Sequence, residues 1–509
     1  MKQALIGVDL GTTSIKAIAF SLDGTQLAKI TTPTVTHYPR PSWAYYEPEE
    51  IWGAICAVLR QLMADLPDEI EPVAVTFASM AEAAVPLDGK GEPTYPIITW
   101  FDRRTVPQAE WWQAEVGNET TALITGLPVK PVFGILKLLW LRDNEPDAFK
   151  RTQKWLNMAD YGAYRLCGTQ ATDYSLASRM LLLDLKHKKW SQTLLDAIDL
   201  PMSILGESVP SATLIGHVHA EAAAATGLPK GLPVCSGGHD HVCGAFALGI
   251  TNPGDVFDSM GTAESVMIAT DAPNLDLAVT MRGVGQGIHV VAGRYYGMSG
   301  MSFSGGAVDW IRRVLLSSAL GQNTSGLSFE TVINLARQAP AGSGGLFFLP
   351  HLRGANAPFN DVRARGAFVG ISSDAETGHF ARAVLEGVAY EFQRIFENLI
   401  GAFQLTPKRS IATGGSTRNE LLMQIKAQLY GQAITIPNVD EATCLGAAML
   451  AGVGAGIYQN FAEASQQVQY TTRIVESEPK AHQFYRQRYE TVYLGLYDAL
   501  REVNRAILA

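Results

Sequence analysis

The sequence predicts an α/β protein built from two duplicated domains. The chain has 509 residues, which is more than a single hydrophobic core usually holds. Short apolar runs that suit strands alternate along it with longer stretches of helical periodicity. An apolar run followed by Gly-Thr, small polar residues and a second apolar run occurs twice, at Gly11-Thr12 and at Gly261-Thr262. A duplicated α/β fold of this kind would hold a phosphate chain between two facing hairpin loops.

Composition and charge exclude several classes of protein. Hydrophobic residues make up 47% and charged residues 17% of the chain, as is typical of soluble globular proteins. The formal net charge is −9 and no block of basic residues occurs, so we expect no nucleic-acid partner. No apolar run approaches the roughly 20 residues of a membrane span, and Asp9 comes too early for a secretory signal. Five scattered cysteines favour free thiols in a reducing compartment, and we therefore expect a cytoplasmic protein with no membrane association.

The first loop that could bind phosphate follows the opening strand, predicted over residues 4–9. Its sequence, Gly11-Thr12-Thr13-Ser14, offers backbone N–H groups and hydroxyls to an anion, and a second strand over 15–21, which contains Lys16, follows it. Asp9 at the end of the opening strand could hold Mg²⁺ through water, because this ion keeps much of its hydration. An ordinary polar hairpin fits the same residues equally well.

Polar side chains follow two further apolar runs, residues 73–77 and 95–100. Glu82 comes shortly after the first run, and Asp102 and Arg103 come directly after the second, which ends in Trp100. Because ligands of α/β proteins lie beyond the carboxyl ends of strands, these side chains are candidates for a pocket that binds a hydroxylated substrate. Charges at strand ends are also often mere solvated caps.

A lone carboxylate follows two glycines in Gly237-Gly238-His239-Asp240, after the apolar run 232–234. Glycine lets backbone approach a ligand closely, so this strand would deliver Asp240 to a cleft, where it could act as the general base of a phosphoryl transfer. The alternative is an ordinary turn in which Asp240 caps the Ala-rich segment that follows. A zinc site is not expected, because four ligands within nine residues give poor tetrahedral spacing; they would be Cys235, His239, His241 and Cys243.

Two more glycine pairs lie in the second half of the chain. Gly305-Gly306 precedes a helix around Asp309, and Gly414-Gly415 joins a strand to a helix predicted over 420–430. A Gly-Gly turn of the second kind lets backbone approach a flat or phosphorylated ligand, although tight strand–helix packing would need it as well. Two long helices without visible chemistry are predicted over 380–399 and 481–508.

Together these motifs resemble the FGGY carbohydrate kinase family, within the sugar kinase–Hsp70–actin superfamily. The resemblance runs nearly from end to end, and residues 133–144 resemble the first signature of the family. It implies two ribonuclease H-like (actin-like ATPase) domains around a deep cleft, which we expect at residues 1–250, mainly for the sugar, and 251–509, mainly for ATP. It also implies a small sugar or polyol as the substrate and ATP and Mg²⁺ as cofactors, and it makes a homodimer an expectation.

The resemblance implies a role for each motif, residue by residue. Asp240 falls on the catalytic base, which accepts the proton of the attacking primary hydroxyl, and Asp9 and Asp240 would hold Mg²⁺. The substrate side is implied to contain Ala81, Glu82, Trp100, Asp102, Arg103, His239 and Asp240. The nucleotide side is implied to contain Gly11, Thr12, Thr13, Ser14, Lys16, Gly261, Thr262, Gly305, Gly306, Asp309, Gly414, Gly415, Ser416 and Asn419.

The substrate side leaves several acceptors open. Xylulokinases carry a Met-His pair where this chain has Ala81-Glu82, and Glu82 resembles the glutamate of the Arg-Glu pair of glycerol kinases without its arginine. Residues 172–179 also resemble glycerol kinases, but Val132 stands where these have a tyrosine, and the His239-Asp240 pair is similar to that of fuculokinases and rhamnulokinases. We expect a ketopentose such as xylulose; the alternatives are a deoxyhexulose or a polyol such as glycerol or erythritol. The rival functions are a chaperone-like ATPase and a non-catalytic sugar-binding protein.

Overall fold

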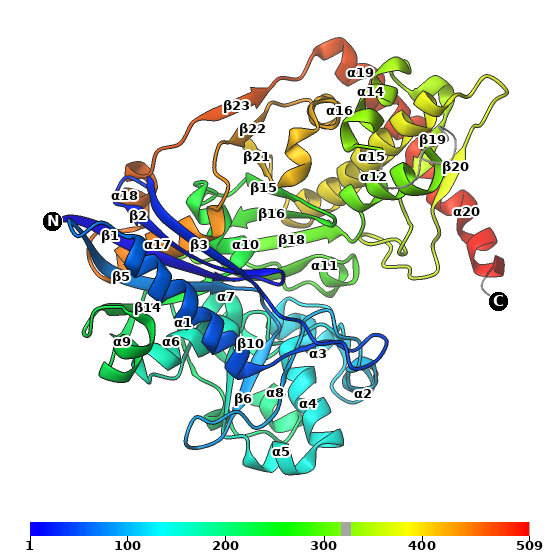
Figure 1. Cartoon of the computed structure of the whole chain (residues 1–509). Helices are drawn as coiled ribbons and strands as arrows, with labels where there is room; N and C mark the ends of the chain where they lie inside the picture. The colour runs from blue at the N-terminus through cyan, green and yellow to red at the C-terminus, as the bar shows by residue number, and fades with distance from the viewer. Residues whose placement is uncertain (317–326, 508–509) are drawn as a thin grey trace.

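The structure is a computed structural model of the chain, and it describes residues 1–316 and 327–507. Two sheets form its centre, one in each half of the chain (Figure 1). The first sheet has six strands, which are, in spatial order, β13 (Leu214–His217), β14 (Pro233–His239), β5 (Ile70–Ser79), β1 (Lys2–Leu10), β2 (Ser14–Ser21) and β3 (Gln26–Pro33). The second has seven, which are β17 (Gly285–Ile288), β18 (Tyr295–Met301), β16 (Glu264–Thr270), β15 (Asp255–Met260), β21 (Arg409–Thr413), β22 (Ile434–Pro437) and β23 (Thr472–Val475). The α/β class predicted from the sequence is confirmed.

The two sheets repeat one local arrangement, centred on β1 and on β15. Strand β1 pairs antiparallel with β2 across the loop at Gly11 and parallel with β5 on its other side. Strand β15 likewise pairs antiparallel with β16 across Gly261 and parallel with β21. Each sheet therefore carries a hairpin loop at the carboxyl end of a central strand, and the predicted duplication of the fold is confirmed.

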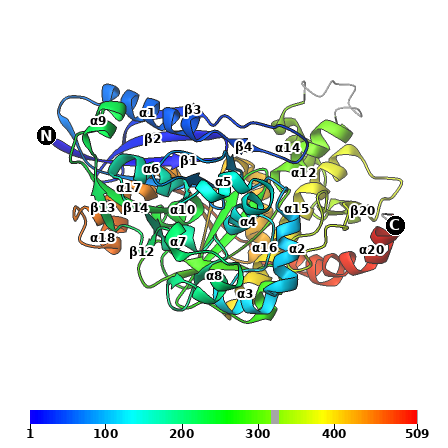
Figure 2. The same ribbon diagram turned by 90° about the horizontal axis from the view of Figure 1, so that it is seen from below.

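Helices cover both faces of the first sheet. Ile6 and Val8 of β1 belong to the apolar core shared with α1 (Pro48–Asp65) and α6 (Met158–Cys167). Leu5 belongs to the core on the opposite face, shared with α10 (Asp240–Ala247) and α17 (Ala442–Gly454). This division follows from the two-residue period of a strand. Figures 1 and 2 show α17, drawn in orange, beside the blue strands of the first sheet, although it lies far along the chain from them.

Two glycines set how closely α17 approaches its neighbours. A Cβ atom at Gly7 of β1 would lie 1.9 Å from the carbonyl oxygen of Cys444, and one at Gly446 would lie 1.9 Å from that of Cys243. Real Cβ atoms do not come so near to backbone oxygens. Helix α17 therefore lies in backbone contact with β1 and α10, and a larger residue at either glycine would push the helix away.

The long helix α15 (Thr377–Phe403) covers the second sheet and extends the predicted helix at both ends. The other main helices around this sheet are α12 (Gly305–Ile311), α14 (Phe329–Gln338), α16 (Glu420–Tyr430), α19 (Pro479–Arg488) and α20 (Leu494–Ile507). The helix predicted over 481–508 is confirmed over the described residues, because α19, a π-helical turn at Tyr489–Tyr493 and α20 follow one another without a gap. Both tyrosines of the π-helical turn pack against Tyr390 of α15, and residue 508 lies outside the described residues. Among the helices in the described ranges, none is both long and apolar enough to cross a membrane.

Residues between β5 and β13 form a further apolar core beside the first sheet. The short elements of this stretch are β6 (Ala84–Leu87), β7 (Ile97–Ile98), α2 (Val106–Glu115), α3 (Asn118–Thr125), α4 (Gly134–Asn144), α5 (Pro146–Arg151), β8 (Lys154–Asn157), β9 (Ala171–Asp173), α7 (Tyr174–Ala177), β10 (Leu183–Asp184), β11 (Lys189–Trp190), α8 (Gln192–Ala197), η1 (Met202–Ile204) and β12 (Glu207–Val209). The earlier strand β4 (Tyr45–Tyr46) joins them by pairing with β7. The strand predicted over 95–100 shrinks to β7, because its partner β4 is only two residues long. The remaining short elements are α9 (Ala220–Thr226), α11 (Leu277–Met281), η3 (Ser343–Gly345), β19 (Phe347–Leu349), β20 (Ala367–Val369), η4 (Gly415–Arg418) and α18 (Phe461–Gln467).

Candidate active site

A cleft of about 210 Å³ lies where elements of both sheets meet. The carboxyl end of β1, the start of α10, the ends of β15 and β21 and the start of α17 all contribute to it. Its lining residues are Asp9, Lys16, Asp240, His241, Gly244, Phe257, Ser259, Thr413, Gly414, Val439, Asp440, Glu441, Ala442 and Thr443. The cleft thus brings together Asp9, Lys16, Asp240 and Gly414, which the sequence placed in four separate segments.

Strand β14 delivers Asp240 to the cleft. A Cβ at Gly237 would lie 1.6 Å from the carbonyl oxygen of Phe77, so only glycine permits β14 to approach β5 this closely. Oδ1 of Asp240 accepts a hydrogen bond from the backbone N–H of His241 at 2.6 Å and lies 3.1 Å from Nε2 of His239. Oδ2 has no hydrogen-bond partner in the described part of the chain, and the side chain is 26% exposed, so this oxygen is open to a ligand. Burial raises the pKa of Asp240. His241 and Arg179 oppose this rise, and the negative charge of Glu82 adds to it.

His239 lies beside Asp240 as a neutral imidazole. Burial lowers its pKa well below the ordinary value, and the neighbouring His241 and Arg179 lower it further. Its Nδ1 atom is buried and has no hydrogen-bond partner among the described residues.

Asp9 faces the same cleft from the end of β1. Its Oδ1 atom is buried without a hydrogen-bond partner in the described ranges, and Oδ2 lies 3.9 Å from Nζ of Lys16, which is its register partner on β2. Burial, and after it the charge of Asp240, raises the pKa of Asp9 to about 7. The described residues contain no cluster of three or more side chains that could enclose a metal ion. The orphaned oxygen and the two facing carboxylates nevertheless suit a cation that keeps most of its water, as Mg²⁺ does.

Lys16 is held between Asp9 and Glu441, the residue that precedes α17. Its Nζ donates to Oε2 of Glu441 at 2.7 Å, and Nζ of Lys29 donates to Oε1 of the same carboxylate at 2.5 Å. This arrangement joins β2 and β3 to the start of α17.

The first glycine loop is also joined to Trp100, which the sequence predicted on the substrate side. The indole N–H of Trp100 donates to Oγ1 of Thr12 at 3.0 Å, while the N–H of Gly11 donates to the carbonyl of Ser14 at 3.1 Å. Thr13 is exposed. The hydroxyls and remaining N–H groups of this loop lie next to Asp9, where phosphate oxygens could reach them.

The three glycine segments of the second half meet at one place. The N–H of Gly305 donates to the carbonyl of Gly261 at 3.1 Å, and that of Gly306 donates to the carbonyl of Thr262 at 3.1 Å. A Cβ at Gly305 would lie 2.5 Å from that Gly261 oxygen and 3.0 Å from Oγ of Ser416. Gly414 has φ 95° and would place a Cβ 2.3 Å from the carbonyl oxygen of Met260, so no other residue fits there without strain.

Two residues predicted on the nucleotide side have local structural partners. The Asp309 carboxylate accepts hydrogen bonds from Arg312 at 2.7 Å and Arg313 at 2.7 Å, both on the following turn. Oδ1 of Asn419 accepts from the N–H of Leu422 at 3.1 Å and so caps α16. Gly415 next to them is exposed.

A buried ionic network beneath these loops was not predicted. Nζ of Lys426, which is fully buried on α16, donates to the carboxylates of Asp258 and Glu264, and the Ser304 hydroxyl donates to Glu264. These partners belong to β15, to β16 and to the N-terminus of α12, the elements that carry the second phosphate loop and Gly305. The signal in the sequence is a lysine on an otherwise apolar stretch of a predicted helix.

On the substrate side, Glu82 has an arginine partner that was not predicted. Nε of Arg179 donates to Oε1 of Glu82 at 2.7 Å and Nη2 lies 2.5 Å from the same oxygen. The charges of both residues act on Asp240, so the pair lies near the carboxylate that the sequence predicted as the base. Ala81 is buried in the apolar core shared with α1 and α6, and its side chain has no polar atom with which to bind a hydroxyl.

Asp102 does not line this pocket, contrary to the expectation from the sequence. Its carboxylate accepts from Nη2 and Nε of Arg104 at 2.8 and 3.0 Å and from the N–H of Ala44 at 2.6 Å, and its side chain is wholly buried. Asp102 and Arg104 therefore form a structural ion pair that fixes the loop after Trp100. Arg103 is exposed beside it and forms no ion pair within the described residues.

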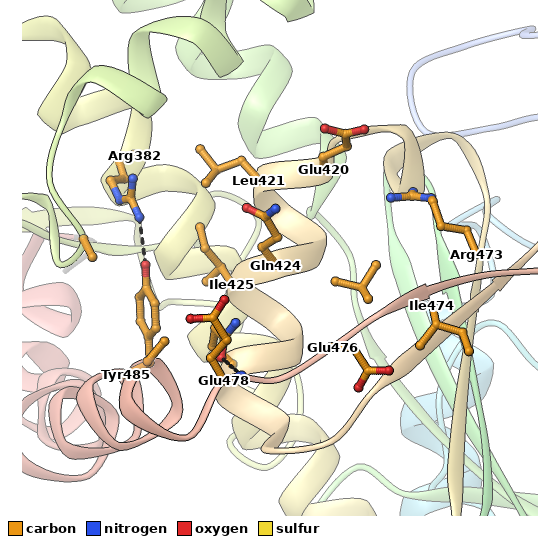
Figure 3. A pocket seen from close by; sticks show the side chains of 14 residues that line it. Arg382, Glu420, Leu421, Gln424, Ile425, Arg473, Ile474, Glu476, Glu478 and Tyr485 are labelled. Carbon is orange, nitrogen blue, oxygen red and sulfur yellow. Dashed lines mark hydrogen bonds between the residues drawn. The ribbon is translucent and has the colours of Figure 1, made fainter.

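A larger cavity of about 590 Å³ lies elsewhere, between α16, β23 and α19 (Figure 3). Charges of both signs line it, among them Arg473 and Glu476, and Arg382 there donates to the Tyr485 hydroxyl at 2.9 Å. None of the residues predicted for the site lines this cavity, so it is not the candidate active site.

Both halves of the chain are similar to domains of one known protein family. The N-terminal domain model of the FGGY family of carbohydrate kinases matches residues 4–247, and its C-terminal domain model matches residues 257–455. A xylulose kinase of Lactococcus lactis subsp. lactis is 28% identical, over 99% of this chain and 98% of its own. Glycerol kinase 2 of Sulfolobus acidocaldarius is 30% identical, over 98% and 97%. The crystal structure of a xylulose kinase from Rhodospirillum rubrum superposes with a TM-score of 0.90 at 30% identity, covering 99% of this chain and 100% of that one.

Proposed function

Because this chain belongs to the FGGY family of carbohydrate kinases, we propose that it transfers the γ-phosphoryl group of ATP to a primary hydroxyl of a ketopentose such as xylulose, with Asp240 as the general base. The observation that carries the base assignment is the environment of Asp240. One of its oxygens is fixed by the N–H of His241, and the other is open to the cleft. The raised pKa brings the carboxyl nearer to neutral pH, which suits a base that must take a proton and release it again.

The proposed step begins with the hydroxyl of the acceptor donating to Oδ2 of Asp240. As the proton moves to that oxygen, the acceptor oxygen forms a bond to the γ-phosphorus and the bond to the bridging oxygen of ADP breaks. The bridging oxygen keeps the electron pair. A base of this kind contributes about 10²–10⁴-fold to the rate.

The glycine loops supply most of the remaining stabilisation in this proposal. The hairpin loops at Gly11-Thr12 and Gly261-Thr262 would donate to the phosphate oxygens from the Thr12 and Thr262 hydroxyls and N–H groups, because the N–H groups of Gly11 and Gly261 already donate to Ser14 and Ala263 within the loops. Lys16 adds a positive charge beside them. Preorganised donors of this kind act mainly by positioning and by stabilising charge, which is how phosphoryl transfer is generally catalysed.

Asp9 would hold Mg²⁺ in this site. Its orphaned oxygen is the observation that fits the ion, whereas the open oxygen of Asp240 is needed for the acceptor proton. When bound, the ion neutralises charge on the transferring phosphates. Closure of the cleft around the acceptor would exclude water, which competes as a phosphoryl acceptor.

The xylulose assignment is supported by relatives and solved structures named xylulose kinases. A polyol is the second candidate, because Glu82 can accept hydrogen bonds from two hydroxyls and a similar protein is named glycerol kinase. A deoxyhexulose is the third, on the basis of the His239-Asp240 pair.

The deciding experiment is a coupled ADP-release screen over ketoses, polyols and aldonates. We expect one class of acceptor to raise turnover strongly above the rate without acceptor, and xylulose to be the best of the ketoses. ADP release that no acceptor increases would instead favour a chaperone-like ATPase. Asp240→Asn should bind the acceptor nearly as well as the wild type but turn over about 10²–10⁴-fold more slowly, and full activity in this variant would refute the base assignment.

A further inference from the structure

We propose that Arg179 is a positioning residue for the acceptor pocket: it fixes the carboxylate of Glu82 so that the second oxygen of that carboxylate recognises the acceptor. The inference rests on the proposed function, since it takes Asp240 as the base and Glu82 as an acceptor contact. To that function it adds Arg179, and it assigns one oxygen of Glu82 to Arg179 and the other to the acceptor. Arg179 acts through Glu82 and is therefore not itself a catalytic residue.

The geometry of the pair leaves one oxygen of Glu82 available. Nε and Nη2 of Arg179 both approach Oε1, at 2.7 and 2.5 Å. Oε2 forms no hydrogen bond within residues 1–316 and 327–507, and it is not among the buried polar atoms that lack a partner. A carboxylate held by one oxygen, with the other accessible, can accept hydrogen bonds from hydroxyls of a polyhydroxy acceptor.

The backbone at Glu82 makes this hold necessary. Glu82 has φ 63°, in the left-handed region that side chains other than glycine rarely adopt, and the residue is buried in the loop between β5 and β6. Such a conformation persists where surrounding contacts fix it, and it occurs often at binding sites. The guanidinium of Arg179 is the charged contact that Glu82 makes there.

Arg179 is itself held from both halves of the molecule. Its guanidinium lies over the ring of Phe133, 5.2 Å from the ring centre, at the start of α4. The preceding Ser178 accepts, at its Oγ, a hydrogen bond of 3.0 Å from the N–H of Ile288 on β17. Tyr296 of β18 also lies beside the pair, and its buried hydroxyl interacts with the guanidinium of Arg179. The pocket wall thus depends on the position of the second sheet.

The charge around the pair agrees with a positioning role. The positive charge of Arg179 balances that of Glu82, so the pocket does not present two bare carboxylates, Glu82 and Asp240, to a neutral acceptor. Without Arg179, Glu82 would repel Asp240 and would be free to turn towards Lys137, whose buried ammonium it already influences.

The test compares Arg179→Met and Arg179→Lys with the wild type in steady-state kinetics with the best acceptor. We expect Arg179→Met to raise the KM for the acceptor about tenfold or more, with the KM for ATP within about twofold of the wild type. Arg179→Lys should recover part of the acceptor KM, because one ammonium can reach Oε1 but cannot hold it with two donors. Glu82→Gln should raise the acceptor KM as well, and the double variant with Arg179→Met should lose little more, since both changes remove the same contact.

Arg165→Met is the matched control. Arg165 on α6 also binds a glutamate and a tyrosine, donating from Nη1 to Glu49 at 3.1 Å and to the Tyr161 hydroxyl at 2.6 Å, but it lies outside the cleft. It should keep both KM values.

Three results would overturn the inference. They are an unchanged acceptor KM in Arg179→Met, parallel rises in the KM values for acceptor and ATP, and Glu82 and Arg179 effects that simply add. If Arg179→Met fails to fold, Arg179→Lys with a wild-type acceptor KM overturns it equally. A wild-type enzyme whose ADP release depends on no acceptor would overturn the proposed function, whereas an acceptor-dependent wild type with unaffected Arg179 variants overturns only this inference.

Discussion

Replacing Lys426 with methionine should destabilise the enzyme and selectively weaken its hold on ATP. Lys426 is fully buried, donates to Asp258 and Glu264, and lies with Nζ 3.6 Å from the centre of the Phe392 ring. Methionine fills similar space but leaves two buried carboxylates facing each other. Removing one partner of a buried ion pair costs about 3–5 kcal/mol, and we expect this loss in the free energy of unfolding at neutral pH.

The cost should depend on pH with a definite sign. Burial raises the pKa of Asp258, and the Lys426 ammonium is the largest effect that opposes this. Without the lysine, the folded state should bind an additional proton at the two carboxylates, so the variant should lose more stability at pH 8 than at pH 6. Because the same residues hold the second phosphate loop and the start of α12, the KM for ATP should rise about tenfold while the acceptor KM stays close to that of the wild type.

Urea unfolding followed by far-UV circular dichroism at pH 6 and pH 8, with steady-state kinetics, measures both effects. The double variant Lys426→Met/Glu264→Gln should recover part of the stability, because it removes one of the two orphaned charges. Lys150→Met is the control, since Lys150 is 74% exposed and lies 3.9 Å from Asp147; this change should stay within about 0.5 kcal/mol. A loss of under about 1 kcal/mol for Lys426→Met, or no recovery in the double variant, would refute the reasoning.

Three further changes test other parts of the site. The pKa of Asp9 is about 7, so its carboxyl is mostly protonated at pH 6 and mostly ionised at pH 8. The KM for magnesium–ATP should therefore fall roughly tenfold between pH 6 and pH 8. Asp9→Asn should abolish that pH dependence. Gly414→Ala should cost more stability and more ATP affinity in thermal-shift titrations than Gly456→Ala, because both glycines have positive φ but only at Gly414 does a Cβ meet backbone, at 2.3 Å. Asp102→Asn should cost about 3–5 kcal/mol by unpairing the buried Arg104, yet leave the order of preferred acceptors unchanged; a switch of acceptor would return Asp102 to the pocket.

The features that the sequence predicted well are local. The strand–glycine loop–strand pattern is encoded within some fifteen adjacent residues at each end of the cleft, so both hairpins and their equivalence could be recognised before any long-range contact was known. The helix over 380–399 was visible in the same way, because its apolar period extends over several turns. We propose a division of the chain near residue 250 on this basis, with α17 as the exception that crosses it.

The features that the sequence did not predict depend on distant partners. Glu82 and Arg179 are 97 positions apart, and Lys426 is 162 positions from Glu264, so no periodicity connects them. For Asp102 the sequence predicted a ligand-binding residue that the structure does not show. Its position after an apolar run suits a ligand-binding residue, but Arg104, two positions further on, binds its carboxylate. In the C-terminal helix, a π-helical turn at Tyr489–Tyr493 packs both of its tyrosines on Tyr390 of another helix, and the helical period of the segment gives no sign of that turn.

The backbone contacts of α17 carry a consequence for how the protein is made. The strands of the first sheet are complete once His239 has been synthesised, and α10 follows them directly, but α17, the second helix on the same face, begins only at Ala442. A ribosome-bound chain must therefore keep part of that apolar face, with Leu5, Ala74 and Ala78, without its second helix while most of the second sheet is translated. A fragment that stops near residue 250 would expose the same face and tend to aggregate. In a chimaera with a relative, the interface between α17 and the first sheet would be mismatched unless Ala442–Gly454 were exchanged together with the first half. Helix α17, which is synthesised late, therefore completes the packing of the half of the chain that is synthesised first.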